Sequence, residues 1–465
     1  MNCIEPKEAI LEKKMRKKAI KVLLKEVLYN SLAQALIKIL FTPHLILKLF
    51  LSLFVLVSTG FASFLVLQSV MTYLSYGVST TSRTVFTTPT LFPKVTFCNL
   101  NGFTTQYAFN LTQSGTFFAT DLTDNEKKSV GHNLDDILFD CKFNLKPCGA
   151  NDFTWSYDGT YGNCYTFNEF NGETNESKSN LKESSIAGPD YGLQITFYVN
   201  IYEKLLDLYG FTWGLGGLIR IGNSSYSTFY LDGGIFIPPG QSTYISIEQT
   251  MQTILPRPYS NCEIESNHHE SSLSLSDLFN LISESSFSFS QQFCFSQCLQ
   301  KYFIEKFNCT FPYLPSLFNQ TNVCNLPLEH LVLYLDRVFT RNFINQMCLP
   351  MCPLECYQNV FKCSLSSYQL IGGQYVAKIL NNSNLTQDFI KRVIDAETSE
   401  KSIVQAFIFY ETLSYTLLTE TIQMDAVSLL ASIGGNLSLF LGVSVFSICE
   451  IIQVAIELCF IQYKT

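Results

Sequence analysis

The sequence is poor in charge and lacks the short motifs of the common enzyme classes. Only 15% of its 465 residues are charged, whereas 47% are hydrophobic, so there is room for membrane spans beside one sizeable folded domain. It has no phosphate-binding loop, nucleophile elbow or metal-ligand cluster, and the GLGG at 214–217 has no strand–helix phosphate context around it. The sequence therefore gives no support for an enzyme, and we expect neither a cofactor nor a bound metal.

A cleavable signal peptide is also missing from its usual place, because the first apolar stretch begins some 45 residues into the chain and is too long. Residues 1–48 carry ten Lys/Arg against four Glu, including the run KKMRKK at 13–18. Such a basic end favours a cytosolic location, whereas nucleic-acid binding is a weak reading of a cluster beside a membrane span. We therefore predict a cytosolic arm over 1–48.

The cysteines lack the CxxC pairs typical of metal sites. Thirteen of the sixteen lie between Cys98 and Cys363, and the adjacent histidines His268 and His269 fall in a polar stretch. Disulfides are therefore favoured over metal binding, and together with sequons in the same region they predict an oxidising, extracellular environment. The sequons lie at Asn110, Asn175, Asn223, Asn308, Asn319, Asn381 and Asn384.

Two apolar segments are candidate membrane spans. Residues 49–73 begin with an uncharged run long enough for one transmembrane helix. Residues 425–460 could extend roughly 54 Å as a helix, against a ~30 Å hydrocarbon core, so this segment is tilted, interrupted or continues beyond the membrane. It contains small residues and two carboxylates seven positions apart, Glu450 and Glu457. Composition alone leaves a pore-lining helix and a packed anchor both open. Residues 461–465 are then a short cytosolic tail.

Residues 74–424 are predicted as one extracellular domain. Aromatic and β-branched runs such as FPKVTF, YGLQITFYVNIY, STFYLDGGIFI and STYISIEQT favour antiparallel strands. The character changes to helix over 275–307, where Cys294 and Cys298 share one helical face. Cys348, Cys352 and Cys356 repeat the four-residue spacing, so two facing segments could be cross-linked as the rungs of a rigid rod.

Several blocks match a known family in order and spacing. They are YLSYGV, FPKVTFCNLNGF, CKFNLKPC, CYTFN, GIFIPPGQSTYISI, LPRPYSNC and, most specifically, LLASIGGNLSLFLGVSVFSICEI. The chain resembles the degenerin/epithelial sodium channel family, which includes acid-sensing and peptide-gated channels. The resemblance implies an α+β membrane protein with two transmembrane helices. They would flank a disulfide-rich extracellular domain with a β-sheet core and a helical, disulfide-laddered thumb at about 262–363, assembled as a trimeric channel.

The resemblance also implies which cysteines pair. The implied pairs are Cys98–Cys164, Cys141–Cys148, Cys262–Cys356, Cys294–Cys352, Cys298–Cys348 and Cys309–Cys324. One further family bridge is missing at both of its ends, and Cys363 is left over. Two other departures concern gating. Gln34-Ala35 stands where the family usually has a His-Gly pair, and YLSYGVSTTSR lacks the histidine that follows the first span in acid-sensing members.

Family positions imply roles for residues of the last segment. Gly442, Val443 and Ser444 would form the selectivity filter, and Ala431, Gly434 and Gly435 the gate; the family often has Ala where Val443 stands. Glu450 and Glu457 would be inner pore acids. Asp425 would form a carboxylate ring at the extracellular mouth, with an ordinary helix-start acid as its alternative. Tyr76 and Tyr259 would couple the extracellular domain to the membrane, unless they are a core aromatic pair.

The sequence thus predicts a multi-pass plasma-membrane cation channel, amiloride-sensitive, with both termini cytosolic. Its partners would be sodium ions (calcium left open), membrane lipid and related subunits in a homo- or heterotrimer, with no nucleic acid. Because the proton-associated histidine is missing, a peptide is favoured as the stimulus over acid, with mechanical or constitutive opening third. One rival is a two-span ATP-gated receptor, which needs several extracellular Lys/Arg converging on phosphates, whereas this region is acidic and lacks the relevant blocks. The second rival is a non-conducting adhesion or scavenger receptor. The second rival would have no use for a last span rich in glycine, serine and carboxylates.

Overall fold

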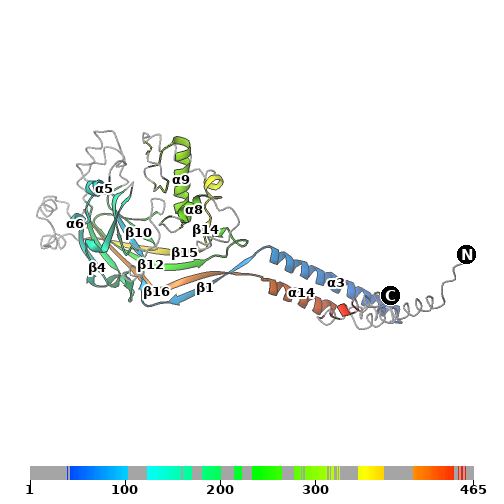
Figure 1. The fold of residues 1–465 in the computed structure, drawn as a ribbon. Helices are drawn as coiled ribbons and strands as arrows, with labels where there is room; N and C mark the ends of the chain where they lie inside the picture. Colours follow the sequence, from blue (N-terminus) through cyan, green and yellow to red (C-terminus); the bar gives the residue numbers. More distant parts are fainter. Residues whose placement is uncertain are drawn as a thin grey trace. The chain divides into compact units, whose positions relative to one another are not determined.

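The computed structural model describes residues 39, 42–102, 123–158, 161–169, 181–199, 214–222, 233–263, 277–283, 285, 289–311, 314, 316–318, 322, 324, 344–370, 402–442, 444, 449, 452–453 and 456. The chain divides into two compact units (Figure 1). One comprises Met1–Ser79 with Thr421–Thr465, and the other comprises Thr80–Glu420. Each unit is described on its own.

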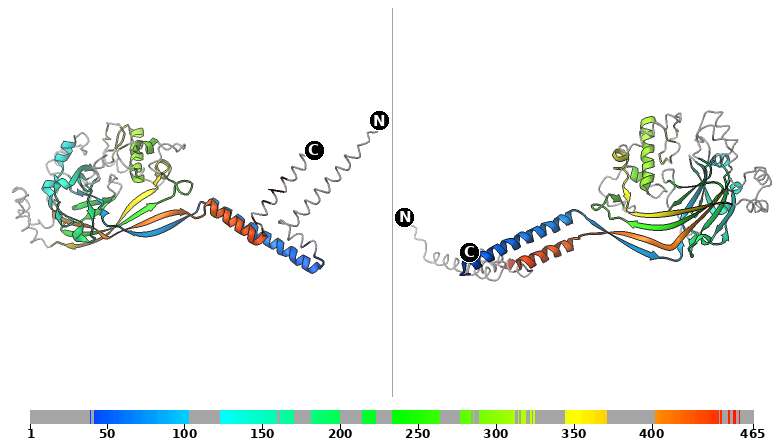
Figure 2. Two further views of the ribbon diagram at one scale, coloured as in Figure 1. Left: turned by 60° about the horizontal axis from the view of Figure 1, so that its bottom comes forward. Right: turned by 180° about the vertical axis from the view of Figure 1, so that it is seen from behind.

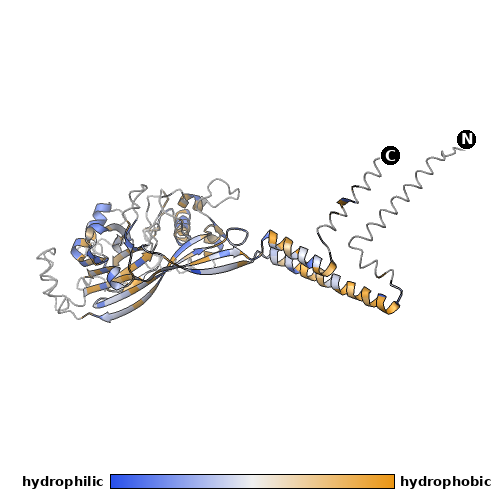
Figure 3. Ribbon diagram, turned by 90° about the horizontal axis from the view of Figure 1, so that it is seen from below, coloured by the Kyte–Doolittle hydropathy of each residue, from blue (hydrophilic) through white to orange (hydrophobic). Residues whose placement is uncertain are grey.

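The described part of the first unit is built on two apolar helices. α3 spans Leu45–Leu74 and α14 spans Ala426–Leu441, and the two lie side by side (Figure 2). α3 is long and apolar enough to cross a membrane, and it is the one helix among the described residues that meets this test. It begins four residues before the predicted span of 49–73. Its hydroxyl side chains donate to carbonyls one turn earlier, as from Ser52 to Lys48 O (2.8 Å) and from Ser63 to Thr59 O (2.8 Å). This bonding satisfies them without water, and the helix surface is largely apolar (Figure 3).

The second unit is organised by two β-sheets. The larger has the strand order β15-β12-β16-β9-β4-β5, and β1 also pairs with β16. The smaller has the order β11-β10-β3-β7-β6. The strands of the larger sheet are β1 Val78–Phe86, β4 Leu138–Phe143, β5 Lys146–Pro147, β9 Leu193–Tyr198, β12 Gln241–Thr253, β15 Tyr357–Gln369 and β16 Ile403–Ile422. Those of the smaller are β3 Lys94–Asn99, β6 Phe153–Asp158, β7 Gly162–Phe167, β10 Gly217–Gly222 and β11 Ile235–Ile237.

The hydrophobic core lies between these sheets. Inward residues of β3, β7, β9, β12 and β16 form one buried cluster. Phe97 of β3 stacks on Phe197 of β9 with ring centroids 3.5 Å apart, and Tyr410 of β16 donates to Leu91 O at 2.8 Å. Alternate residues of β16 from Val404 to Tyr410 are buried, the period-2 pattern of a strand with one face on the core.

The predicted strands are found, with one difference in direction. β9 and β11 fall within predicted runs, whereas β3 and β12 overlap theirs and extend beyond them; residues 227–232 of the third run lie outside the described residues. Antiparallel pairing was predicted and is wrong for one contact, because β12 and β16 run parallel. β12 does pair antiparallel with β15. The reason is that β15 and β16 lie on opposite sides of β12 and run in opposite directions, so only one of them can be antiparallel to β12.

A helical segment stands beside the larger sheet. It contains α8 Asp277–Ser283, α9 Gln291–Phe307 and a turn of π-helix, Ile344–Cys348. Ser290 caps α9 by accepting from Phe293 N (3.1 Å), and Asn308 ends it in the left-handed conformation (φ 54°). The remaining short elements are β2 Thr90–Leu91, α5 Asp124–Val130, α6 Leu134–Ile137, η1 Ala150–Asp152, β8 Glu183–Ser184, η2 Pro189–Tyr191, β13 Cys262–Glu263 and β14 Leu354–Glu355.

Six disulfides cross-link this unit. They join Cys98–Cys164, Cys141–Cys148, Cys262–Cys356, Cys294–Cys352, Cys298–Cys348 and Cys309–Cys324, the same pairs that the family resemblance implies. Three of them connect α9 and β13 to residues 348–356 as successive rungs, which we call the disulfide ladder: Cys262–Cys356, Cys294–Cys352 and Cys298–Cys348. The segment that faces α9 is not a second long helix: Cys348 ends the π-turn, and Cys352 lies between this turn and the short strand β14. Cys363 is free and half-buried in β15.

Candidate functional site in the C-terminal helix

Helix α14 begins at a carboxylate cap. The Asp425 side chain accepts a hydrogen bond from Ser428 N at 2.7 Å, which satisfies one of the four amide groups that a helix start leaves without a partner. A negative charge at this position also complements the positive end of the helix dipole. The helix-start role therefore has a contact behind it, whereas a ring of Asp425 carboxylates needs further copies of the chain and stays a prediction.

One face of α14 packs against α3. Its half-buried residues recur every three or four positions, and Phe440 meets Phe61 of α3 edge to face with ring centroids 5.2 Å apart. This face contains Leu429, Ser432, Ile433, Asn436, Leu437 and Phe440.

The exposed side of α14 is rich in small residues, although it also carries Val427, Leu430 and Leu439. Ser428, Ala431, Gly434, Gly435 and Ser438 lie on this small-residue face. A Cβ added at Gly434 or Gly435 would meet nothing within 4 Å. Glycine lowers the stability of a helix interior by about 1 kcal/mol relative to alanine, and no contact within the described chain requires it here. Packing among the described residues therefore does not account for glycine at these positions.

The helix stops at Gly442. This residue is left-handed (φ 68°), a conformation that glycine adopts without the cost of a Cβ clash, and its N–H donates to the carbonyls of Leu437 and Ser438. α14 is thus 16 residues long, shorter than the roughly 20 needed to cross a bilayer. Of the three ways predicted to accommodate this long apolar segment, an interruption is what the described residues contain. Ser444 is described and exposed, whereas Val443 lies outside the described residues.

The remaining predicted residues fall in different places. Glu450 and Glu457 lie outside the described residues, as do Gln34-Ala35 and the sequons at Asn110, Asn175, Asn223, Asn319, Asn381 and Asn384. Tyr76 and Tyr259 are described, but they belong to different units, so their coupling stays a prediction. Tyr76 has a left-handed backbone (φ 50°) just after α3, and Tyr259 N donates to Pro256 O in a turn at 3.2 Å.

The architecture can be compared with known proteins at this point. The chain matches the family described as "Amiloride-sensitive sodium channel" over residues 27–126 and 107–454, nearly its whole length. The chain belongs to this family. Its family is one of ion channels and not of enzymes, and the disulfide-rich β domain and the apolar α3 are consistent with it.

Named relatives are similar at modest identity. The chain is 27% identical over 353 residues to degenerin-like protein unc-105 of Caenorhabditis elegans. The alignment covers 73% of this chain and 36% of that protein. It is 27% identical over 332 residues to epithelial sodium channel subunit gamma of Rattus norvegicus, covering 71% and 48% respectively. The chain therefore spans half or less of the length of these curated relatives. A solved structure, of a proton-activated chloride channel, aligns with a TM-score of 0.31 and 6% identity over 88% of this chain and 98% of that one, which is too weak to carry an argument.

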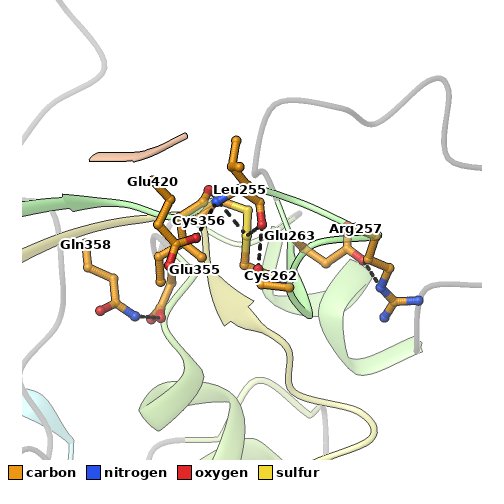
Figure 4. The surroundings of a disulfide bond; sticks show 10 residues. Leu255, Arg257, Cys262, Glu263, Glu355, Cys356, Gln358 and Glu420 are labelled. Carbon is orange, nitrogen blue, oxygen red and sulfur yellow. Dashed lines mark hydrogen bonds and ion pairs between the residues drawn. A yellow bond between two sulfur atoms is a disulfide. The ribbon is translucent and has the colours of Figure 1, made fainter. Parts of the chain in front are cut away.

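Sequence reasoning missed two carboxylates in this sodium channel family chain, both near the first rung of the disulfide ladder (Figure 4). Glu420, near the end of β16, accepts from Leu255 N at 3.1 Å. Glu355 accepts from Gln291 N at 2.7 Å and from Gln358 Nε2 at 3.1 Å. Glu355 therefore ties the start of α9 to the start of β15, and Glu420 ties the segment after β12 to the strand that precedes α14.

No sequence signal could have identified these two residues. Each contact joins positions far apart in the chain, with Glu420 and Leu255 separated by 165 residues and Glu355 and Gln291 by 64. Other acidic residues in this part of the chain look the same in the sequence but make different contacts. Glu263, for example, lies 3.5 Å from Arg257 Nε. Only the three-dimensional placement separates a surface carboxylate from one that holds two elements together.

Proposed function

We propose that this chain is a subunit of a cation channel of the plasma membrane, in which α14 of three subunits lines a central pore. The observation that carries the proposal is the small-residue face of α14, which points away from α3 and ends at the left-handed Gly442. Small residues let helices approach closely in a membrane. The two neighbouring helices of one subunit leave this face uncovered, as a pore-lining helix requires.

The end of α14 also suits a cation. The last carbonyl groups of a helix have no amide partner within the helix, and the dipole places a partial negative charge of about half an electron there. In this proposal Gly442, Val443 and Ser444 continue the constriction with further carbonyls and a hydroxyl, the ligand types that replace the water shell of a sodium ion. Val443 is larger than the alanine frequent in the family, so its cation preference need not match that of the best-known members.

Charged residues would guide ions on either side. In the proposed trimer three Asp425 carboxylates at the outer mouth would raise the local cation concentration, and Glu450 with Glu457 would do so at the inner end. Ala431 with Gly434 and Gly435 would form the closed gate, because only small side chains fit where three helices converge. Family membership supports amiloride sensitivity and coupling through Tyr76 and Tyr259, which belong to the same proposal, as does glycosylation of the sequons.

The stimulus in this proposal is an extracellular peptide. YLSYGVSTTSR lacks the histidine associated with proton gating, and Gly77 follows Tyr76. The backbone of this segment pairs with the end of the extracellular domain's last strand, since Gln423 N donates to Gly77 O at 3.0 Å. The effect of a peptide bound to the extracellular domain would be transmitted to the pore through β16, which leads directly into α14.

Expression in oocytes tests the proposal. The chain is expressed alone and with related subunits, and membrane current is recorded during application of amidated peptides, then acid, each with and without amiloride. We expect an amiloride-sensitive inward sodium current that a peptide evokes. A current evoked by acid and by no peptide would show that the stimulus is acid and not a peptide. Surface expression without current in every combination would favour a non-conducting receptor and reject the channel.

A further inference from the structure

One sequon of the second unit lies within the described residues, at the end of α9. It consists of Asn308, Cys309 and Thr310, the Asn-X-Thr pattern at which N-linked oligosaccharides are attached. Its middle residue forms the Cys309–Cys324 disulfide. A modification signal and a structural cross-link therefore occupy the same three residues.

The two polar residues of this sequon differ in accessibility. Asn308 ends α9 in the left-handed conformation and is exposed, so an oligosaccharide on its side chain would extend into solvent. Thr310 is only 7% exposed. Its Oγ1 donates to Asn322 O at 3.2 Å, and its N–H donates to the same carbonyl at 2.8 Å. The folded chain therefore presents the asparagine and hides the hydroxyl.

The residues around Thr310 hold it in place. Cys324 N donates to Thr310 O at 2.9 Å, beside the disulfide of Cys324. Phe311 N donates to Oε1 of the buried Gln300 of α9, and Gln300 Nε2 donates back to Phe311 O, both at 2.8 Å. The Phe311 ring also stacks on Phe303 with ring centroids 5.0 Å apart. The Thr310 hydroxyl therefore becomes accessible only when Thr310 separates from Cys324 and Phe311 separates from α9.

Transfer of an oligosaccharide requires that hydroxyl. In the transfer, the Asn308 side-chain nitrogen attacks the sugar carbon of a lipid-linked oligosaccharide diphosphate. A C–N bond forms, the C–O bond to the diphosphate breaks, the diphosphate leaves with the bonding electrons, and the amide loses one proton. An amide nitrogen is a weak nucleophile, so the transferase must hold the asparagine together with the hydroxyl two residues later, as the Asn-X-Ser/Thr pattern records.

We propose that Asn308 is a conditional glycosylation site, at which attachment of an oligosaccharide competes with closure of the Cys309–Cys324 disulfide. In the closure, two electrons and two protons pass from the thiols of Cys309 and Cys324 to a protein disulfide of an oxidoreductase, which becomes a dithiol. Before closure Thr310 is accessible and Asn308 accepts the oligosaccharide. After closure Thr310 is buried, and a chain that is still unmodified stays so.

The two reactions overlap in time. Cys324 follows Cys309 by 15 residues, about 1–3 s of synthesis at roughly 5–20 residues per second, and disulfides form in seconds to hours. We therefore expect a mixture of modified and unmodified chains. The inference rests on the extracellular location of this domain in the proposed function, because both reactions belong to the secretory pathway.

Mass spectrometry of the full chain, expressed in animal cells, measures the modified fraction. Enzymatic removal of the oligosaccharide in heavy-oxygen water converts each modified asparagine to labelled aspartate, and the tryptic peptide 307–337 contains Asn308. We expect partial modification of Asn308 in the wild type. In Cys324→Ser, which keeps the sequon but cannot close the disulfide, the modified fraction should rise to nearly all chains.

A second disulfide variant provides the matched control. Cys148→Ser opens the Cys141–Cys148 disulfide and leaves the Asn308 sequon and its disulfide intact, so the modified fraction at Asn308 should match that of the wild type. The proposal is overturned if Cys324→Ser does not raise this fraction, or if Cys148→Ser raises it equally, which would trace the change to a general folding defect. Modification at no sequon of the chain would instead contradict the extracellular location itself, and with it the proposed function.

Discussion

Adding one methyl group to the small-residue face tests whether α14 is a pore-lining helix or a membrane anchor. In Gly435→Ala, the new Cβ meets nothing within 4 Å inside the chain, and the same holds for Gly60→Ala in α3. Both changes raise helix propensity by about 1 kcal/mol. Since that gain applies to open and closed channels alike, it cancels from the gating equilibrium.

The two variants differ only if α14 meets other copies of itself. Where three helices converge in a closed pore, an added methyl group would cost about 1–3 kcal/mol of overpacking. Because the open pore is wider, nearly all of this cost falls on the closed state, and the equilibrium shifts towards opening by about five- to 150-fold. Gly60 lies on a helix that would face lipid and its partner α14, so Gly60→Ala should leave gating unchanged.

The assay is the resting current in oocytes, normalised to surface protein measured by biotinylation. We expect a raised resting current for Gly435→Ala and wild-type behaviour for Gly60→Ala. If Gly435→Ala reaches the surface, stays closed at rest and opens normally, the helices do not converge at this position. Equal effects of both substitutions would instead trace the change to helix propensity.

Three further predictions concern α14 and the residues at its two ends, and a fourth concerns Cys363 of β15. Ala431→Phe should give a larger standing cation current than Gly435→Ala, because it adds a whole ring to the same face. Asp425→Asn should weaken divalent block while surface expression persists, since Asn caps a helix as well as Asp does but carries no charge. Ser444→Cys should allow block by thiophilic metal ions from the pore. Cys363 should react slowly with maleimide at pH 8, because burial raises the pKa of its thiol to about 11 and leaves about 0.1% of it as the reactive thiolate.

Each has a clear contrary result. A silent Ala431→Phe would place this residue against lipid, and unchanged divalent sensitivity of Asp425→Asn would leave only its capping role. The absence of metal block in Ser444→Cys would remove this residue from the constriction. Labelling of native Cys363 as fast as that of the denatured chain would mean that its environment is open.

The sequence predicted the elements better than their connections. The aromatic and β-branched runs at 191–202 and 242–250 and the helical character of 275–307 reflect local composition, which a sequence records directly. The parallel pairing of β12 with β16 depends on which side of β12 each of β15 and β16 occupies, which no local pattern records. Disulfide pairing needed the family resemblance, because many pairings satisfy the same spacing. The contacts of Glu355 and Glu420 were beyond prediction since both depend on that long-range topology.

The strength of the connections differs sharply between parts of the chain, and this difference bears on how a stimulus could act. Four of the six disulfides lie between Cys262 and Cys356, so α9 and its facing segment are well suited to move as one body. The ties further along are hydrogen bonds, which include the pairing of β16 with β12 and β1 and the bonds from Leu255 N to Glu420 (3.1 Å) and from Gln423 N to Gly77 O (3.0 Å).

Hydrogen bonds of this kind contribute only about 0.5–1.5 kcal/mol each, so they can break and form again during gating, whereas the disulfides cannot. Elements that move are drawn from the less stable parts of a fold. In the proposed channel the disulfide ladder would therefore stay rigid, while hydrogen bonds such as those of Glu420 and Gly77 could rearrange. β16 ends at Ile422, three residues before Asp425 caps α14. So short a connection leaves little slack, and a displacement of the strand would be passed to the first turn of the helix.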